Sequence, residues 1–210
     1  MEYPLTSLDT QQQAGLRAVV RLAQTCDYEA SHSHQVTRLA LRLFDEVEPL
    51  HHLGLDQSYW LACAGILHDI GWIEGWHKHH KTALRIILTT PLLPFNNKER
   101  LIVGSIARYH RKALPDISHD HFASLEPEDR QMVCILSACL RMADGLDHSH
   151  QSRVLDLRCK VNPKKIIAVC DVKSESEEEA LAAQQRTDLL AVVFQREVVI
   201  EWNLEARQLS

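Results

Sequence analysis

The chain has 210 residues and is poor in glycine, with only seven glycines and none in a Gly-x-Gly cluster. The phosphate-binding loops of the nucleotide-binding folds need such clusters, because only glycine lets the backbone approach the phosphates closely. The sequence therefore predicts no glycine-rich phosphate loop. An anionic substrate would have to be held by metal ions or by a local group of basic side chains.

The six cysteines form no Cys-x-x-Cys pair, which is the usual spacing of a structural zinc site. Several lie among apolar residues, as Cys134 and Cys139 do, and this is typical of reduced core thiols in a cytosolic protein. No apolar run approaches the ~20 residues that a membrane span requires. The first residues also lack the basic and then apolar pattern of a signal peptide. We therefore expect a cytoplasmic protein with no membrane partner.

The chain also has no excess of positive charge, since the net charge is −5 with histidines neutral. Nothing in this balance indicates a nucleic-acid surface. The fractions of apolar residues (45%) and charged residues (24%) are those of an ordinary globular protein. A chain of this length can bury a proper core, either as one domain with an appendage or as two small domains.

Helical periodicity dominates the first 151 residues. Apolar residues recur at helical spacing from Val36 to Val47, and His32 falls on the same stripe. Residues 113–124, by contrast, predict a loop over a site. Further helices are expected over residues 56–70, 79–90, 98–110 and 126–147.

The pattern changes after Gln151, where β-like runs begin. We expect a mainly α fold, with a helical domain over residues 1–151 and a small β-β-α-β unit over residues 152–210. The apolar C-terminal strands could form the edge of a homodimer or cover the helices of their own chain. The expected strands are 154–159, 166–170 and 197–202, with one helix over 174–194.

The pair His68-Asp69 is the strongest indication of function. It closes an apolar helical run that begins at Ala62. Burying polar groups of this kind without partners would cost ~2–7 kcal/mol. A bound metal ion would remove this cost, although a carboxylate that merely caps the helix or orients the histidine is the simpler alternative.

Other residues suited to metal binding follow at wide spacings: His32, His110, Asp144 and the group His77, His79 and His80. Imidazole and carboxylate together suit a catalytic divalent ion such as Mn, Fe, Mg or Zn. Bridging carboxylates can hold two such ions ~3.5–4 Å apart, which suits phosphate ester chemistry.

Some of these assignments have direct competitors. His34 competes with His32, but only His32 lies on the apolar stripe. His110 could be a histidine that interacts favourably with the end of its helix. Spacing alone does not choose among His77, His79 and His80. Histidines in turns without apolar periodicity are read as surface residues, namely His51, His52, His119 and His121.

The order His…His-Asp…His…His…Asp resembles the HD superfamily of metal-dependent phosphohydrolases. A closer resemblance rests on five segments in order, and it covers nearly the whole chain. The segments are Glu29–Val36, Ala64–Gly71, His79–Lys81, Arg108–Lys112 and Leu140–His150. Together these segments are similar to the HD-type C-terminal region of the exopolyphosphatase/guanosine-pentaphosphate phosphohydrolase family.

The resemblance implies an HD-domain helical bundle that holds one or two divalent ions. It selects His80 as the third histidine ligand, with His79 as the alternative. Basic side chains beside the ligands could neutralise developing negative charge on a substrate. The expected metal ligands are His32, His68, Asp69, His80, His110 and Asp144. The expected catalytic residues are Asp69, Lys81 and Arg141, and the expected substrate contacts are Lys81, Arg111, Lys112 and Arg141.

The predicted function is hydrolysis of a small phosphorylated molecule, either a nucleotide or a polyphosphate-like substrate. In the enzymes of this family the phosphatase site belongs to an actin-like domain that precedes the HD region, and this sequence contains no such domain. A regulatory module that binds metal or nucleotide without turnover is therefore one alternative. A di-iron oxygenase of the HD type is another, although the basic residues near the ligands favour phosphate over an uncharged substrate.

Overall fold

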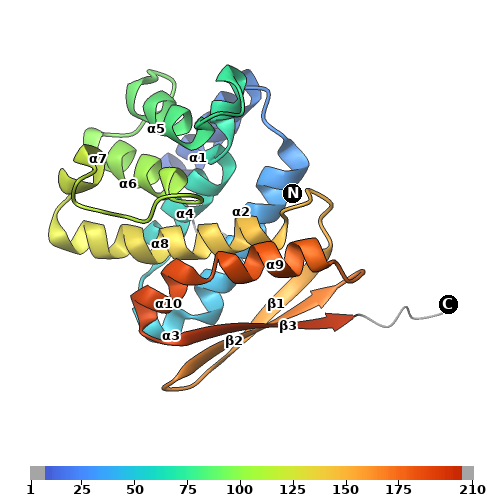
Figure 1. Ribbon diagram of the computed structural model, residues 1–210. Helices are drawn as coiled ribbons and strands as arrows, with labels where there is room; N and C mark the ends of the chain where they lie inside the picture. Colours follow the sequence, from blue (N-terminus) through green and yellow to red (C-terminus); the bar gives the residue numbers. More distant parts are fainter. Residues whose placement is uncertain (1–7, 205–210) are drawn as a thin grey trace.

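The computed structural model describes residues 8–204, and it is mainly helical with a small C-terminal sheet (Figure 1). The predicted fold class is thereby confirmed. The main helices are α1 (Thr10–Thr25), α2 (Ala30–Glu46), α4 (Leu55–Leu67), α5 (His79–Thr89), α6 (Asn97–Arg108) and α8 (Pro127–Leu146). Short helices are α3 (Glu48–His51), the 3-10 helix η1 (Ile70–Glu74) and α7 (Asp120–Ala123), followed by β1 (Val154–Val161), β2 (Lys165–Val172), α9 (Glu177–Gln185), α10 (Asp188–Phe194) and β3 (Glu197–Leu204).

Helix α4 lies at the centre of the helical part, and α2, α6 and α8 pack around it. Every residue of α4 from Ala62 to Leu67 is fully buried, which explains why the segment is apolar on all sides. Gly65 allows α2 to approach α4 closely, since a Cβ there would lie 2.6 Å from the Oγ1 atom of Thr37 on α2. The end of this central helix is therefore surrounded by side chains from several other helices.

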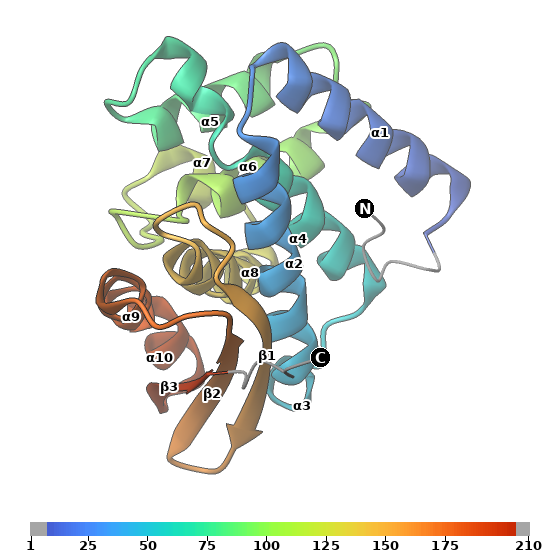
Figure 2. The same cartoon turned by 90° about the vertical axis from the view of Figure 1, so that its right-hand side faces the viewer.

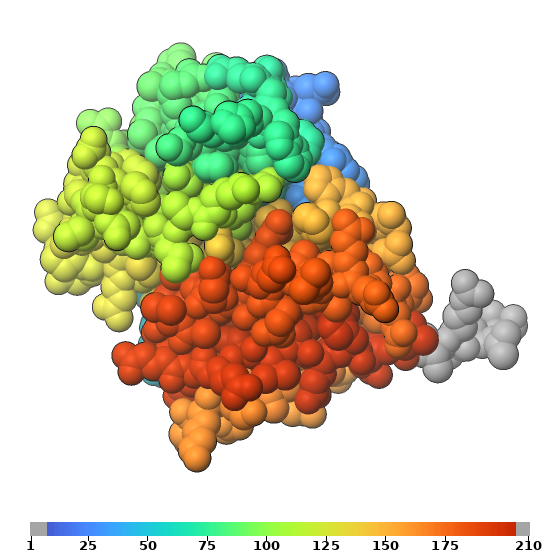
Figure 3. Space-filling view, in the orientation of Figure 1, coloured from blue at the N-terminus to red at the C-terminus, as the bar shows by residue number. Residues whose placement is uncertain are grey.

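The sheet has the order β1-β2-β3, with β1 antiparallel and β3 parallel to β2. Strand β1 packs against α2, whereas α9 and α10 pack against α8 (Figure 2). In the space-filling view, the C-terminal segments from orange to red cover the lower part of one face, beneath the green helical segments (Figure 3). Buried side chains of the sheet and the helices form one continuous hydrophobic core. The division into two domains near residue 152 stays a prediction.

The single helix expected over residues 174–194 is wrong in detail, because two helices replace it. Helix α9 ends where the Arg186 N–H donates to the Ala183 carbonyl, a tightened bond over three residues. Helix α10 then starts at Asp188. The break places Arg186 on the connection between the two helices, facing α8.

The helix expected over residues 56–70 also ends earlier than predicted. Helix α4 stops at Leu67, so His68 and Asp69 lie on the connection to η1. The loop expected over residues 113–124 contains the short helix α7.

All six cysteines are free thiols. No helix within residues 8–204 is long and apolar enough to span a bilayer.

Candidate metal centre

Two of the expected ligands lie where α4 ends, at the middle of the bundle. His68 is fully buried, and its Nδ1 lies 2.7 Å from the carbonyl oxygen of Gly65. A carbonyl can only accept, so Nδ1 must donate and Nε2 keeps its lone pair. Asp69 follows outside the helix, which leaves its carboxylate free to face the Nε2 atom of His68 at 3.5 Å.

His32 approaches from α2 on the apolar stripe that the sequence predicts, and it is buried. Its Nδ1 lies 2.9 Å from Asp147 Oδ2. This carboxylate orients the ring so that Nε2 points at Asp69 and Asp144, at 3.9 Å and 3.5 Å. The competing His34 points elsewhere, with its Nε2 atom 2.9 Å from the Tyr28 hydroxyl.

The other two histidines come from the start of α5 and from just beyond α6. The Nδ1 atoms of His79 and His110 lie 3.0 Å from the Trp76 carbonyl and 2.7 Å from the Ala107 carbonyl. Their Nε2 atoms lie 3.1 Å and 3.5 Å from Asp69 Oδ1. A Cβ at Gly71 would lie 2.0 Å from the His79 carbonyl oxygen, so only glycine lets η1 approach α5 this closely.

Asp69 therefore lies between two groups of possible ligands. Its Oδ2 atom faces the first group, and its Oδ1 atom belongs to the second. The groups are His32, His68 and Asp144 on one side and Asp69, His79 and His110 on the other, and within each group the donor atoms lie within 4.8 Å of one another. The Nε2 atoms of His32, His68 and His79 are buried and have no hydrogen-bond partner among residues 8–204. Buried imidazole nitrogens without hydrogen-bond partners around a carboxylate fit a metal ion, so the residues present could hold one or two ions.

Asp144 completes the first group from the C-terminal end of α8. Its Oδ1 faces His32 and His68, at 3.5 Å and 3.7 Å, whereas its Oδ2 accepts a hydrogen bond from Arg186. A Cβ at Gly145 would lie 2.8 Å from the Cα of Ala183, so α9 comes very close to α8 here. This close packing lets Arg186 reach the centre from the C-terminal unit.

The electrostatics of the centre keep both carboxylates ionised. Burial opposes ionisation of Asp69, but its interactions with the surrounding imidazole rings, first that of His68 and then the hydrogen bond with His79, outweigh burial and hold the pKa of Asp69 well below its usual value. Burial likewise opposes ionisation of Asp144, and the Arg186 guanidinium is the main cause that lowers its pKa. Ionised carboxylates are the form that binds cations.

The histidines respond in opposite directions. Burial disfavours the charged form of His32, but the hydrogen bonds and charges of Asp144 and Asp147 outweigh burial and raise its pKa to about 10. Burial lowers the pKa of His110 to about 3, so this ring is neutral and ready to act as a ligand.

The structure places His79, the alternative, next to Asp69, whereas His80 faces a hollow beside the centre. The Nδ1 atom of His80 is buried, and no described residue offers it a hydrogen bond. Burial and then the charge of Arg108 lower the pKa of His80 to about 3. The geometry thus favours His79 over His80 as the third histidine of the candidate ligand set.

The hollow beside His79 is strongly basic, and we call it the cationic hollow. It contains three of the predicted substrate contacts, Lys81, Arg111 and Lys112. Arg108 also lines it, and its Nη1 atom is buried with no hydrogen-bond partner in the described part of the chain. A buried guanidinium N–H without a hydrogen-bond partner is costly, and an anion bound there would remove this cost.

Arg141, the fourth predicted contact, lies elsewhere. Its Nε and Nη2 atoms donate to the two carboxylate oxygens of Asp188 at 2.7 Å and 2.9 Å, and it does not line the cationic hollow. This bidentate pair joins α8 to α10. The geometry gives Arg141 a role in holding the C-terminal unit against the helices.

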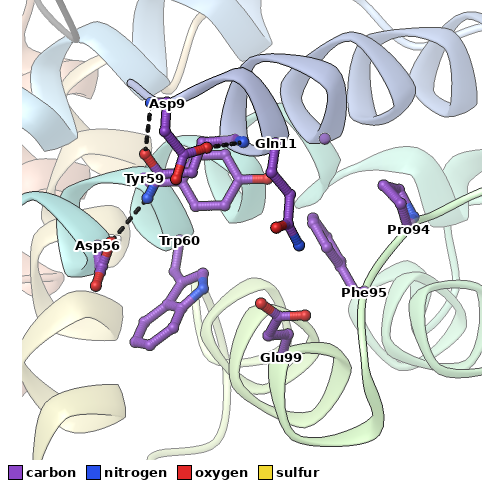
Figure 4. A pocket seen from close by; sticks show the side chains of 10 residues that line it. Asp9, Gln11, Asp56, Tyr59, Trp60, Pro94, Phe95 and Glu99 are labelled. Atoms are coloured by element: carbon purple, nitrogen blue, oxygen red, sulfur yellow. Dashed lines mark hydrogen bonds between the residues drawn. The ribbon is translucent and has the colours of Figure 1, made fainter. Parts of the chain in front are cut away.

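A separate hollow lies between α1, α4 and the start of α6 (Figure 4). Three carboxylates, those of Asp9, Asp56 and Glu99, line it together with the Tyr59 and Trp60 rings. None of its lining residues, all within residues 8–204, is a histidine or cysteine. It therefore lacks the donor set of the metal centre.

Sequence reasoning did not assign three residues that contact the site: Arg108, Asp147 and Arg186. Asp147 follows Asp144 by three residues at the end of a helix, so the spacing could have placed both carboxylates on one side. Arg108 stands two residues before His110, in one of the five segments that carry the family resemblance, but it was given no role. Nothing in the sequence around Arg186 distinguishes it from a solvated residue.

Comparison with known proteins gives two matches. Residues 16–206 match the family described as Ppx/GppA phosphatase, domain III. A curated relative from Pseudoalteromonas atlantica, named guanosine-5'-triphosphate,3'-diphosphate pyrophosphatase, is 26% identical over 147 residues. This match covers 66% of the present chain but only 29% of the relative.

Proposed function

Since the chain belongs to the Ppx/GppA phosphatase, domain III family, we propose that it is a metal-dependent phosphohydrolase of the HD type. Its substrate would be a phosphorylated small molecule, either a nucleotide or a polyphosphate-like anhydride. One observation carries this proposal. Four inward-facing histidines surround the Asp69 carboxylate, and His79 also lines the cationic hollow.

In this proposal the ligands are His32, His68, Asp69, His79, His110 and Asp144. Divalent ions at such a site lower the pKa of water and polarise phosphoryl oxygens. The protein contributes the rigid placement of the donors, since each of the four histidines is oriented through its Nδ1 atom.

The cationic hollow supplies the second requirement of the reaction, which is neutralisation of phosphate charge. Lys81 and Arg111 can meet phosphoryl oxygens from the rim, whereas Arg108 offers a buried and unpaired N–H donor. Guanidinium groups bind phosphate oxygens with planar, charge-assisted hydrogen bonds. A substrate with at least two phosphates could contact both the ions and this hollow.

The proposal is tested by elemental analysis of the purified protein together with phosphate release from nucleotides and inorganic polyphosphates. We expect bound divalent metal and release that stops when a chelator removes it. Bound metal without release from any substrate of the panel would reject the enzyme and favour a regulatory module. Dioxygen consumption by an iron-loaded protein would favour an oxygenase.

Arg108→Met should raise the stability of the protein and weaken its binding of substrate. The substitution removes a buried charge whose Nη1 atom has no hydrogen-bond partner among residues 8–204, so we expect the free energy of unfolding to rise by about 1 kcal/mol. We expect the KM of the phosphorylated substrate to rise about tenfold or more, because a charge-assisted contact is lost. Thermal unfolding and steady-state kinetics on the same preparations measure both effects.

Arg100 provides the matched control on the same helix. Its guanidinium donates to the carbonyls of Ile87, Thr90, Leu93 and Phe95, so it is fully used within the fold. Arg100→Met should lower stability and leave KM unchanged. If Arg108→Met behaved in the same way, the guanidinium of Arg108 would be structural and the anion site would be rejected.

A further inference from the structure

A second hollow opens on Asp69, and its chemistry differs from that of the cationic hollow. It contains no lysine or arginine among its described lining residues. Aromatic rings and carboxylates form its walls, so we call it the aromatic hollow. Its lining residues are Asp27, Tyr28, Glu29, Asp69, Trp72 and His150.

The rings of the aromatic hollow are held in place from behind. His150 stacks on His32 with a centroid distance of 3.6 Å and an interplanar angle of 3°, and its Nδ1 lies 2.7 Å from a Glu29 carboxylate oxygen. The Trp72 ring lies 6.4 Å from the His150 ring and is 40% exposed. A large aromatic ring left open beside a catalytic centre can stack on a flat ligand.

The carboxylates restrict what this flat ligand can be. Asp27 makes no side-chain hydrogen bond or ion pair with the residues that the structure describes, and its carboxylate can only accept. Asp27 and Glu29 repel phosphate groups and favour a partner with N–H donors. A nucleobase with an amino group satisfies both requirements, because it combines a flat π face with N–H donors.

The two hollows meet at the metal centre. Asp69 lines the aromatic hollow and His79 lines the cationic hollow, and their Oδ1 and Nε2 atoms are 3.1 Å apart. Trp72 and Trp76, one in each hollow, touch edge to face with centroids 5.1 Å apart. One molecule could therefore place an aromatic group in one hollow and phosphates in the other, across the centre.

We propose that the aromatic hollow is a nucleobase subsite, with Trp72 as the stacking ring and Asp27 as the acceptor for a base amino group. This inference rests on the proposed phosphohydrolase function and narrows its substrate class. The substrate is a nucleoside polyphosphate with an amino-bearing base, oriented with its phosphates toward Arg108 and Lys81. Inorganic polyphosphate would bind only through the cationic hollow.

The test compares kcat/KM for cytidine triphosphate, uridine triphosphate and inorganic tripolyphosphate with the metal-loaded protein. The two nucleotides differ in the group at position 4 of the ring, an amino group against a carbonyl. We expect cytidine triphosphate to be preferred over both others. Trp72→Ala should reduce the ratio of nucleotide to tripolyphosphate about tenfold, since one stacked base is lost. Asp27→Asn should reduce the ratio of cytidine to uridine nucleotide.

Ile73→Ala is the matched control, because Ile73 is 53% exposed on the same short helix and lines neither hollow. It should leave both ratios unchanged. Binding of cytidine monophosphate, measured by calorimetry, gives a second readout that needs no turnover. We expect Trp72→Ala to weaken this binding about tenfold as well.

The outcomes separate the two proposals. Turnover with equal ratios in wild type and Trp72→Ala would reject the nucleobase subsite and keep the phosphohydrolase. Binding of cytidine monophosphate that depends on Trp72, without turnover of any substrate, would reject the phosphohydrolase and keep the subsite.

Discussion

Asp69→Asn is expected to remove most of the bound metal and to reduce phosphate release at least about a thousandfold. The Asp69 oxygens are the groups that face both sets of donors, with Oδ1 near His79 and His110 and Oδ2 near His68 and His32. Asparagine has nearly the same size, but it carries no charge and offers one oxygen. Loss of a shared ligand removes both metal affinity and the chemistry that the ions supply.

The measurements are metal content by elemental analysis, phosphate release and circular dichroism on the same preparations. We expect the helical signal to be retained, because Asp69 lies on a connection outside α4. Asp56→Asn is the matched control, since Asp56 stands at the other end of α4 in the separate hollow (Figure 4). Full release by a metal-free Asp69→Asn protein would place the catalytic site elsewhere.

The sequence was informative where burial and periodicity act together. His32 lies on an apolar helical stripe, and His68 closes an apolar run, so both could be expected to face the core. Asp144 is flanked by apolar residues on α8, and the same reasoning applies. These residues do lie close together, as the two groups around Asp69 show.

The choice between His79 and His80 could not be made by periodicity, because both are buried on the first turn of α5. It depends on the direction in which α5 starts. Lys78 adopts a left-handed backbone conformation (φ 60°), and Gly71 lets η1 approach the first turn. Both features turn His79 toward Asp69. They are tertiary effects that a single sequence does not reveal.

Arg141 and Arg186 show the same limit for charged residues. Both are arginines, and the sequence alone does not show which carboxylate each one pairs with. The packing of the C-terminal unit on α8 determines their partners. The break between α9 and α10 sends Arg186 to Asp144 and brings Asp188 to Arg141. The C-terminal unit therefore contributes Arg186 to the candidate metal centre, a contact that the sequence of the helical residues alone does not reveal.

Asp147 offers the clearest test of support from outside the ligand set. It is fully buried, and its two oxygens accept from His32 Nδ1 at 2.9 Å and from the Ser152 N–H at 2.7 Å. Asp147→Asn removes a negative charge close to the cation site and weakens the orientation of His32. Both effects act in the same direction, so we expect metal affinity to fall about 10–100-fold.

The affinity is measured by competition with a chelator of known strength. Asp129→Asn is the control, because Asp129 lies at the opposite end of α8 and pairs with Lys98 on the surface. The two variants share a helix and a chemical change, and they differ in whether a histidine depends on the carboxylate. Unchanged metal affinity in Asp147→Asn would mean that His32 is oriented by packing alone, and it would argue that the stacked ring of His150 is sufficient to hold it.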